Sequence, residues 1–414
     1  MREKEDIYII GAGVSGLIAA YELEQAGYRP VIIEQSDEVG GRVKTLKEKG
    51  YALDLGFQVL LSAYPLANKY LDMDKLQLNR LESGAMIYAN NKSYLIGDPL
   101  RNWKVLFPTL MAAIGTFGDK LKILKLNRRL NQKSLEEIFA SPEKTTQEYL
   151  VEFGFSPKII DRFFKPFFAG IFLEPDLRTS SRMFEFVYKM FGEGYATIPK
   201  LGIGAISQQL KGKLQHTQFI FNSKVEKVTT EHIVMSSGET KPHQGVIVAS
   251  QASSLLPDLT APKTLWKNCM CLYVEVDQTN IPHKTIALIS DPGNYANNLY
   301  AYQDPNTGKT ILSVTTLKHN QKSDQEVVDK IIEEVKQYAG STEIKYIHHY
   351  SINQALPDVQ GLRMTAEPHE SETLENVFLA GDYLLNGSLN AAMESGRLAA
   401  KGMIQKRERI ASGK

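Results

Sequence analysis

Three glycines near the N-terminus have the spacing that a bound pyrophosphate requires. They lie in Gly11-Ala12-Gly13-Val14-Ser15-Gly16, between a short apolar run and a segment with helical periodicity. Gly11 permits a tight turn, Gly13 lets the backbone approach a pyrophosphate, and Gly16 lets helix and strand pack closely. The N-terminus of the helix then directs N–H groups and its positive dipole end towards the phosphates. Such glycines can also form a turn without a ligand, but in this context they predict a dinucleotide site.

An acid and a second glycine-rich turn follow. Glu34 ends the next strand about twenty residues further on, where it can accept hydrogen bonds from the hydroxyls of an adenosine ribose and disfavours a 2′-phosphate. The run Val39-Gly40-Gly41-Arg42 can bring a second loop to the pyrophosphate, and Arg42 supplies a planar fork of donors. Arg42 could instead form a surface salt bridge. Together the two turns favour FAD over NAD.

A third element lies far along the chain. Phe378–Asp382 is an apolar strand that ends in Gly-Asp, and a helical pattern begins within Ser388–Gly396. Asp382 can bind hydroxyls on the ribityl or phosphate side of a flavin nucleotide. A helix that begins near Asn390 can direct backbone N–H groups at the pyrimidine end of the flavin and stabilise negative charge there. This third element alone could be an ordinary strand–loop–helix connection. One bound FAD molecule, however, explains all three elements together.

The surrounding elements alternate as in a nucleotide-binding fold. Asp6–Ile10, Val14–Gln25 and Arg29–Glu34 read as strand, helix and strand. Helical patterns dominate residues 101–190, and short strands return over residues 219–250. A further set of strands, a polar helix over Asp324–Tyr338 and a final helix over Leu389–Gln405 complete the pattern.

This order predicts an α/β fold with interleaved domains, which is natural for 414 residues. We expect a glutathione-reductase-type FAD-binding Rossmann-like domain and an α+β substrate domain with a mixed sheet and helices. The FAD-binding domain is assigned to residues 1–90, 196–265 and 350–414, and the substrate domain to residues 91–195 and 266–349.

Composition argues against several classes of partner. The 48 Lys and Arg residues nearly balance 47 Asp and Glu residues, so we expect no nucleic-acid partner. Cys269 and Cys271 are the only cysteines, too few for a disulfide framework or a zinc site, and no metal site is predicted. Met1–Asp6 is charged, unlike a signal peptide. The apolar stretch Val105–Phe117 is shorter than the roughly 20 residues of a spanning helix. A cytoplasmic protein is expected.

The chain resembles, from end to end, the flavin-containing amine oxidase superfamily, which includes phytoene desaturases and protoporphyrinogen oxidases. Besides the three motifs, the resemblance rests on residues 54–65 (DLGFQVLLSAYP), 163–194 and 347–358 (IHHYSINQALPD). It implies non-covalent FAD, with the backbone of Val225 at the adenine. The residues implied in cofactor binding are Gly11, Gly13, Ser15, Gly16, Glu34, Gly40, Gly41, Arg42, Gly56, Val225, Gly381, Asp382, Leu389, Asn390 and Ala391.

The sequence also departs from the pattern of that superfamily. Ser36 stands where amine oxidases often carry an arginine, and Phe57 stands where they tend to have a second glycine. Ser388 takes the place of an aromatic residue that guides amines in monoamine oxidases, which argues against an amine substrate. No cysteine lies near the C-terminal flavin motif, so a thioether link to the flavin is excluded there.

Two stretches bear on the substrate. Residues 153–195 are dense in phenylalanine and tyrosine, which is more typical of a core than of a pocket, although relatives cover an elongated apolar ligand with this segment. Asp119–Leu130 predicts a helix with Leu121, Leu124 and Leu126 against a face rich in lysine and arginine. Such a helix is commonly a domain helix with a solvated face, but it can also lie on an anionic membrane surface.

The sequence therefore predicts an FAD-dependent oxidoreductase that removes hydride from, or isomerises, a hydrophobic small molecule such as a polyene or a tetrapyrrole. The flavin accepts the hydride and the protein positions the substrate, so no catalytic residue is assigned. One alternative is an amine oxidase that forms an imine with oxygen as acceptor. Another is a non-catalytic lipid-binding protein of the Rab GDP-dissociation-inhibitor type, against which Glu34, Asp382 and the intact glycines argue. The oligomeric state stays open.

Overall fold

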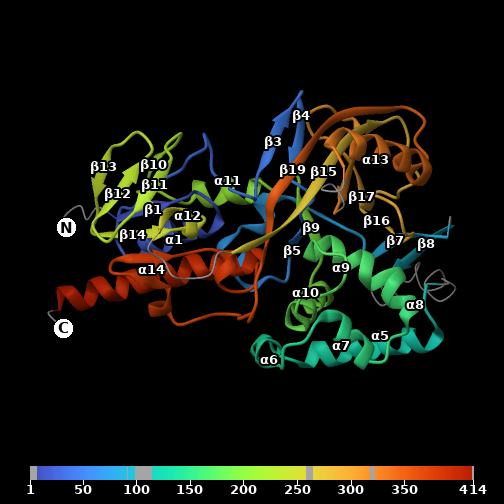
Figure 1. The fold of residues 1–414 in the computed structure, drawn as a ribbon, viewed down its shortest axis with the longest axis horizontal. Helices are drawn as coiled ribbons and strands as arrows, with labels where there is room; N and C mark the ends of the chain where they lie inside the picture. Colours follow the sequence, from blue (N-terminus) through green and yellow to red (C-terminus); the bar gives the residue numbers. More distant parts are fainter. Residues whose placement is uncertain (1–6, 91, 98–113, 258–263, 318–321, 413–414) are drawn as a thin grey trace.

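The computed structural model describes residues 7–90, 92–97, 114–257, 264–317 and 322–412. Two sheets and a layer of helices make up the molecule (Figure 1). One sheet lies on the left of the view with both chain termini, the second lies at the upper right, and the helices of residues 117–193 lie below the second sheet.

The first sheet is a parallel, nucleotide-binding type of sheet with one antiparallel edge. Its strands follow the order β10 (Gln218–Ile220), β2 (Val31–Ile33), β1 (Ile7–Ile10), β14 (Gly245–Val248), β21 (Val377–Leu379) and β20 (Glu372–Leu374). Helices α1 (Val14–Gln25) and α14 (Leu389–Ala411) pack on one face. The three-stranded meander β11 (Val225–Val228), β12 (His232–Met235) and β13 (Thr240–Pro242) covers the other. The central strands are apolar throughout because both faces are buried.

The second sheet is mixed and has seven strands. The order is β19 (Ile344–Asp358), β15 (Leu265–Val276), β18 (Thr310–Thr316), β17 (Ala296–Gln303), β16 (Ile286–Ile289), β7 (Gly84–Ala89) and β8 (Lys92–Gly97). Helix α13 (Asp324–Ala339) buries Val327, Ile331 and Val335 against one face. The long strands β15 and β19 pair from Val276 back to Leu265 and run from this sheet towards the first one (Figure 1).

The helical layer consists of α-helices and a π-helical turn, and several of the helices begin with a side-chain cap. They are α5 (Phe117–Gln132), α6 (Leu135–Ala140), α7 (Thr146–Glu152), α8 (Pro157–Ile159), a π-helical turn (Ile160–Phe164), α9 (Lys165–Phe172) and α10 (Ser181–Glu193). A capping box begins each of α5, α6 and α7, which satisfies backbone N–H groups that would otherwise lack partners. Phe164, Phe168 and Phe184 pack on one another and are buried.

Smaller elements connect these parts. They are the hairpin β3 (Thr45–Glu48) and β4 (Tyr51–Asp54), the small sheet β5 (Leu60–Leu61), β9 (Ala196–Pro199) and β6 (Leu78–Arg80), and helices α2 (Pro65–Tyr70), α3 (Met73–Leu76), α11 (Ala205–Gly212) and α12 (Ala252–Leu255). Two 3-10 turns, Pro368–Ser371 and Asp382–Leu384, precede α14.

The predicted fold class is confirmed, and the final helix is longer than expected because it continues to Ala411. The predicted domain boundary after residue 90 would place β7 with the nucleotide-binding segments, whereas β7 pairs with β8 and β16 in the second sheet. We therefore propose that the boundary falls before Gly84. Among the described residues, no helix combines the length and apolarity needed to span a bilayer. Met1–Asp6 and most of Val105–Phe117 lie outside those residues.

Candidate functional site

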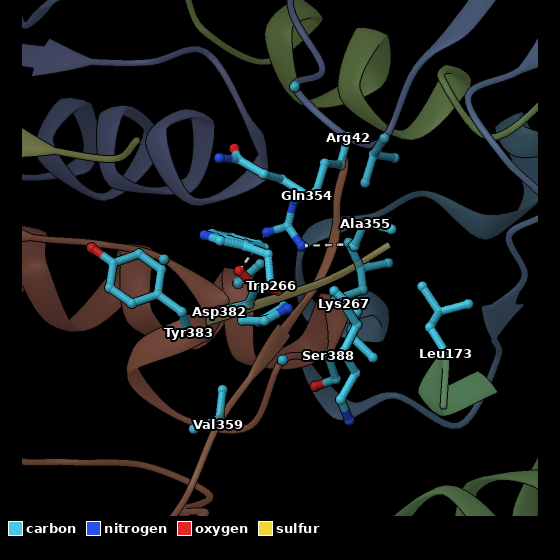
Figure 2. A pocket seen from close by; sticks show the side chains of 18 of the residues that line it. Arg42, Leu173, Trp266, Lys267, Gln354, Ala355, Val359, Asp382, Tyr383 and Ser388 are labelled. Atoms are coloured by element: carbon cyan, nitrogen blue, oxygen red, sulfur yellow. Dashed lines mark hydrogen bonds and ion pairs between the residues drawn. The ribbon is translucent and has the colours of Figure 1, made fainter. Parts of the chain in front are cut away.

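A large cavity runs between the two sheets and the helical layer. Its volume is about 1390 Å³, above the ~300–1,000 Å³ of ordinary small-molecule pockets. It therefore has room for an extended ligand together with a second molecule. The cavity wall seen in Figure 2 combines Arg42, Trp266, Lys267, Asp382 and Ser388, which come from distant parts of the chain.

Most of the residues predicted to bind a cofactor line this cavity. They are Gly11, Gly13, Ser15, Glu34, Gly40, Gly41, Arg42, Gly56, Val225, Gly381, Asp382 and Leu389. Gly16, Asn390 and Ala391 do not line it. For these three residues we propose a structural role in place of a cofactor contact, for the reasons given below.

The first glycine turn has an open side and a packed side. Gly11 has a φ of 104°, in the left-handed region that favours glycine. A Cβ added at Gly13 would meet no atom within 4 Å, whereas a Cβ at Gly16 would lie 2.1 Å from the carbonyl oxygen of Gly11. Gly13 thus exposes backbone to the cavity, as a pyrophosphate cradle requires. Gly16 allows the start of α1 to pack against the turn.

Glu34 is buried beside the same turn with its carboxylate fixed. One oxygen accepts the N–H of Ala12 at 2.8 Å, and the other accepts the N–H and hydroxyl of Ser36 at 2.9 and 2.8 Å. Ser36, which stands where amine oxidases often carry an arginine, therefore orients the acid. Lys44 brings a cation to this end of the cavity, where its Nζ lies 3.5 Å from the Ser36 hydroxyl.

The second glycine turn lies against the first. The N–H of Gly40 donates to the carbonyl oxygen of Ala12 at 2.9 Å. Gly41 has a φ of 58° and lies close to Gly13. Arg42 follows and donates to Asp382 at 2.5 Å and to the carbonyl of Ala355 at 3.3 Å. The N-terminal and C-terminal motifs, which are hundreds of residues apart in the chain, thus meet at this ion pair.

Polar groups at the start of α14 have partners within the protein. The hydroxyl of Ser388 caps the helix by accepting the N–H of Ala391 at 3.0 Å. The side chain of Asn390 turns to Leu66, whose N–H it accepts at 3.0 Å. The backbone N–H of Ala391 already donates to the hydroxyl of Ser388. This bond argues against the predicted contact between that N–H and a flavin.

These residues fit the dinucleotide predicted from the sequence. The open backbone at Gly13, the carboxylate of Glu34 and the guanidinium of Arg42 line one cavity, and they have the chemistry that a phosphate cradle, a ribose acceptor and a phosphate-binding cation require. Residues 14–404 match the family described as flavin containing amine oxidoreductase. The chain belongs to this family. The predicted resemblance and the FAD cofactor are thereby confirmed.

Known relatives span a range of substrates. An L-amino-acid oxidase of Trimeresurus stejnegeri is 30% identical over 37% of the chain and 32% of its own length. Protoporphyrinogen oxidase 2 of Arabidopsis thaliana is 23% identical over 70% of the chain and 52% of its own length. The chain thus matches between about a third and a half of the length of these relatives.

Solved structures share the fold over nearly the whole chain. A protein of Exiguobacterium sp. 255-15, named as a candidate protoporphyrinogen oxidase, has a TM-score of 0.74 at 16% identity and covers 98% of this chain and 99% of its own. Cyclohexylamine oxidase of Brevibacterium oxydans has a TM-score of 0.70 at 14% identity over 98% and 100%. At these identities the likeness establishes the fold.

The sequence did not single out Trp266 and Lys267, which β15 brings to the cavity. Trp266 and Lys267 enter it from β15, opposite Pro357 and Leu356 of β19. The Nζ of Lys267 lies 3.0 Å from the hydroxyl of Thr179 and 3.5 Å from Asp358. In the sequence, Lys267 is a cation near the start of an otherwise mostly apolar strand. No motif identifies such a lysine as a site residue.

Asp54 ties the β3–β4 hairpin to the loop before α11, just before cavity residues Leu55 and Gly56. It accepts the Thr45 hydroxyl at 2.6 Å and the N–H of Ile203 at 2.9 Å. Burial raises the pKa of Asp54 to about 6, against the lowering effect of these hydrogen bonds.

This shift predicts a pH dependence of stability. The folded pKa lies above the unfolded value of about 3.9, so protonated Asp54 stabilises the fold. This contribution is lost as pH rises from about 4 through about 6. Asp54→Asn keeps the acceptor oxygen but does not titrate. We therefore expect this variant to lack the pH-dependent change in the free energy of unfolding, which amounts to roughly 2–3 kcal/mol. Urea unfolding over that pH range measures it, and an identical slope in both proteins would contradict the assignment.

Proposed function

We propose that this protein is an FAD-dependent oxidoreductase that takes hydride from a hydrophobic substrate, such as a polyene or tetrapyrrole, in a desaturation, dehydrogenation or isomerisation. The observation that carries the proposal is the apolar lining of the cavity beyond the cofactor-binding residues. Besides polar residues such as Asn298 and Thr315, the cavity has the apolar lining residues Leu61, Tyr64, Phe167, Ile171, Phe172, Leu173, Met183, Val187, Phe191, Ile286 and Leu288. We call these residues the apolar chamber.

The aromatic stretch of residues 153–195 has two roles in this proposal. Phe164, Phe168 and Phe184 are buried in the core of the helical layer, which is the usual place for such a dense run of aromatic residues. Phe167, Phe172 and Phe191 line the chamber instead. The helical layer can therefore exclude water from an apolar ligand while its own core keeps the chamber in place.

The cofactor supplies the hydride acceptor when bound. Gly11, Gly13 and Gly41 shape the backbone that receives the pyrophosphate, Glu34 takes the ribose, and Arg42 adds positive charge. Glu174 also lines the cavity, but its carboxylate accepts the backbone N–H groups of Asp176 and Thr179. That carboxylate is committed to the loop, so we assign it no proton transfer and leave substrate positioning to the chamber.

An amine substrate fits the site less well. Ser388 is buried, caps α14 and donates to Asn386 at 2.7 Å, so it provides no aromatic wall for an amine. Membership in a family of oxidoreductases also leaves the non-catalytic lipid-binding alternative without support. Some relatives are nevertheless named as oxidases of amines or amino acids, and the test below includes those substrates.

A substrate panel tests the proposal. The purified yellow protein is mixed without oxygen with a polyene, a reduced tetrapyrrole, cyclohexylamine and an L-amino acid, and bleaching of the visible flavin band is followed. We expect bleaching by a hydrophobic compound at least about a hundredfold faster than by the amines, a transition-state difference of about 2.7 kcal/mol. Reoxidation by oxygen or by a quinone then identifies the acceptor. Bleaching by amines alone would overturn the proposal in favour of the amine oxidase.

We also propose that α5 contacts an anionic lipid surface. Phe117, Leu121 and Leu124 are 71%, 54% and 51% exposed and recur at helical spacing on one side. Lys125 and Arg128 are exposed on the same helix. Leu126, predicted to share the apolar face, is instead buried in the core. An exposed apolar stripe beside cations is complementary to an anionic bilayer.

Vesicle flotation tests this contact. Wild-type protein is expected to float with phosphatidylserine-containing vesicles and to stay behind with neutral ones. The double variant Leu121→Asp, Leu124→Asp should lose at least about tenfold in binding, about 1.4 kcal/mol. Ile410→Asp is the matched control, because Ile410 is 57% exposed on the distant end of α14. Equal loss in the control, or no flotation of the wild type, would contradict the contact.

A further inference from the structure

The indole of Trp266 lies on the cavity wall beside Arg42. Trp266 is the second residue of β15, and the guanidinium carbon of Arg42 lies 5.1 Å from the centroid of its ring. This is within the range of a cation–π contact. Figure 2 shows the indole close to both Arg42 and Asp382. The ring is therefore a third contact that fixes Arg42, besides Asp382 and Ala355.

The N–H of this indole is buried and has no acceptor among the residues that the structure describes. An indole nitrogen can only donate. A buried donor that has lost water and gained no partner destabilises the fold, and such groups are uncommon in native proteins. Because the ring lines the cavity, an acceptor on a bound molecule can satisfy it.

The neighbours of the indole indicate which acceptor that is. Arg42 and Asp382 belong to the motifs that face the pyrophosphate and ribityl groups in the proposed cofactor site, and these groups are rich in oxygen acceptors. We propose that Trp266 is a cofactor-binding residue. Its N–H donates to an oxygen in the pyrophosphate–ribityl part of FAD, and its ring holds Arg42 towards the same part. This inference rests on the proposed cofactor site.

The inference also assigns a role to the second sheet. The glycine turns and Asp382 belong to the first sheet and its connections, whereas Trp266 comes from β15 of the second sheet. A cofactor held by both would link the sheet that binds the nucleotide to the sheet that borders the chamber. Loss of the indole N–H should then weaken cofactor binding while the apoprotein keeps its stability.

Single-tryptophan protein allows a direct test. Trp103 and Trp266 are the only tryptophans in the chain, so Trp103→Phe leaves one indole, which is labelled with nitrogen-15. After removal of the flavin, FAD should shift the single indole N–H signal downfield and slow its exchange with water. AMP, which lacks the ribityl group and the second phosphate, should leave the signal in place. A signal that FAD does not move would overturn the proposal.

Affinity gives the second measurement. Trp266→Phe keeps an aromatic ring against Arg42 and removes only the donor, so the Kd for FAD should rise about tenfold, or about 1.4 kcal/mol. Trp103→Phe is the matched control and should bind FAD as the wild type does. Unchanged affinity in Trp266→Phe would also overturn the inference. If Trp266→Phe fails to fold, the indole signal of Trp103→Phe decides alone. A wild-type protein that takes up no FAD would defeat the proposed function itself.

Discussion

Gly13→Glu is expected to give a folded protein without flavin. Gly13 has a φ of −72°, which any residue adopts, and a Cβ there meets no atom within 4 Å. The new side chain can therefore extend into the cavity, where its carboxylate would stand beside the pyrophosphate. Repulsion between like charges at about 4 Å costs ~4 kcal/mol near a protein surface. The affinity for FAD should fall about a thousandfold.

The ratio of visible flavin absorption to protein absorption measures this loss, and thermal unfolding of the apoproteins checks the fold. Gly212→Glu is the matched control, because Gly212 is exposed at the end of α11 and a Cβ there also meets no atom within 4 Å. This control should stay yellow. Full flavin occupancy in Gly13→Glu would show that the pyrophosphate lies elsewhere.

The sequence predicted the parts of the site whose geometry is local. Gly11, Gly13 and Glu34 lie within one β-α-β unit, in which the turn, the helix and the next strand fix where each residue lies. The spacing therefore indicates the contact without knowledge of the rest of the chain. The meeting of Arg42 with Asp382 is not local, and it could be predicted because one ligand explained both motifs.

The residues that the sequence did not reveal depend on contacts between distant segments. Trp266 and Lys267 reach the cavity because β15 pairs with β19, about ninety residues later, in a register with two irregularities. Alternation within one strand does not tell which distant strand it pairs with, and bulges interrupt the alternation itself. The structural role that we propose for Asn390 and Ala391 could not be predicted from the sequence for a related reason. The cap by Ser388 and the contact with Leu66 decide where their polar groups point.

The face that α5 buries was also only partly predictable. Periodicity showed an amphipathic helix, but it does not state which apolar residues face the core. Leu126 and Leu130 are buried, while Leu121 and Leu124 are exposed. The choice follows from the capping box of Thr116 and Asp119 and the bonds of Asp119 to Ser156, which fix the rotation of the helix start. The helix therefore presents two apolar sides.

Gly16→Ala and Gly396→Ala are expected to damage the fold itself. Helices α1 and α14 cross closely, so that a Cβ at Gly396 would lie 2.2 Å from the carbonyl oxygen of Ser15. A Cβ at Gly16 would lie 2.1 Å from the carbonyl of Gly11. Backbone atoms cannot move aside as a flexible side chain can. Each substitution should cost about 3 kcal/mol and lower the Tm by roughly 3–4 °C.

Gly13→Ala is the control for this prediction, because it adds the same methyl group to the same turn in open space. It should keep the Tm of the wild-type apoprotein and reduce only the affinity for FAD. The two substitutions would thus show that Gly13 serves cofactor binding, whereas Gly16 serves the packing of α1. A wild-type Tm in Gly396→Ala would show that α1 and α14 do not cross as closely as the structure has them, and a wild-type Tm in Gly16→Ala would show the same of α1 and its preceding turn. In the first case the first and last motifs would lose one of the contacts that bring them together, besides the ion pair of Arg42 with Asp382.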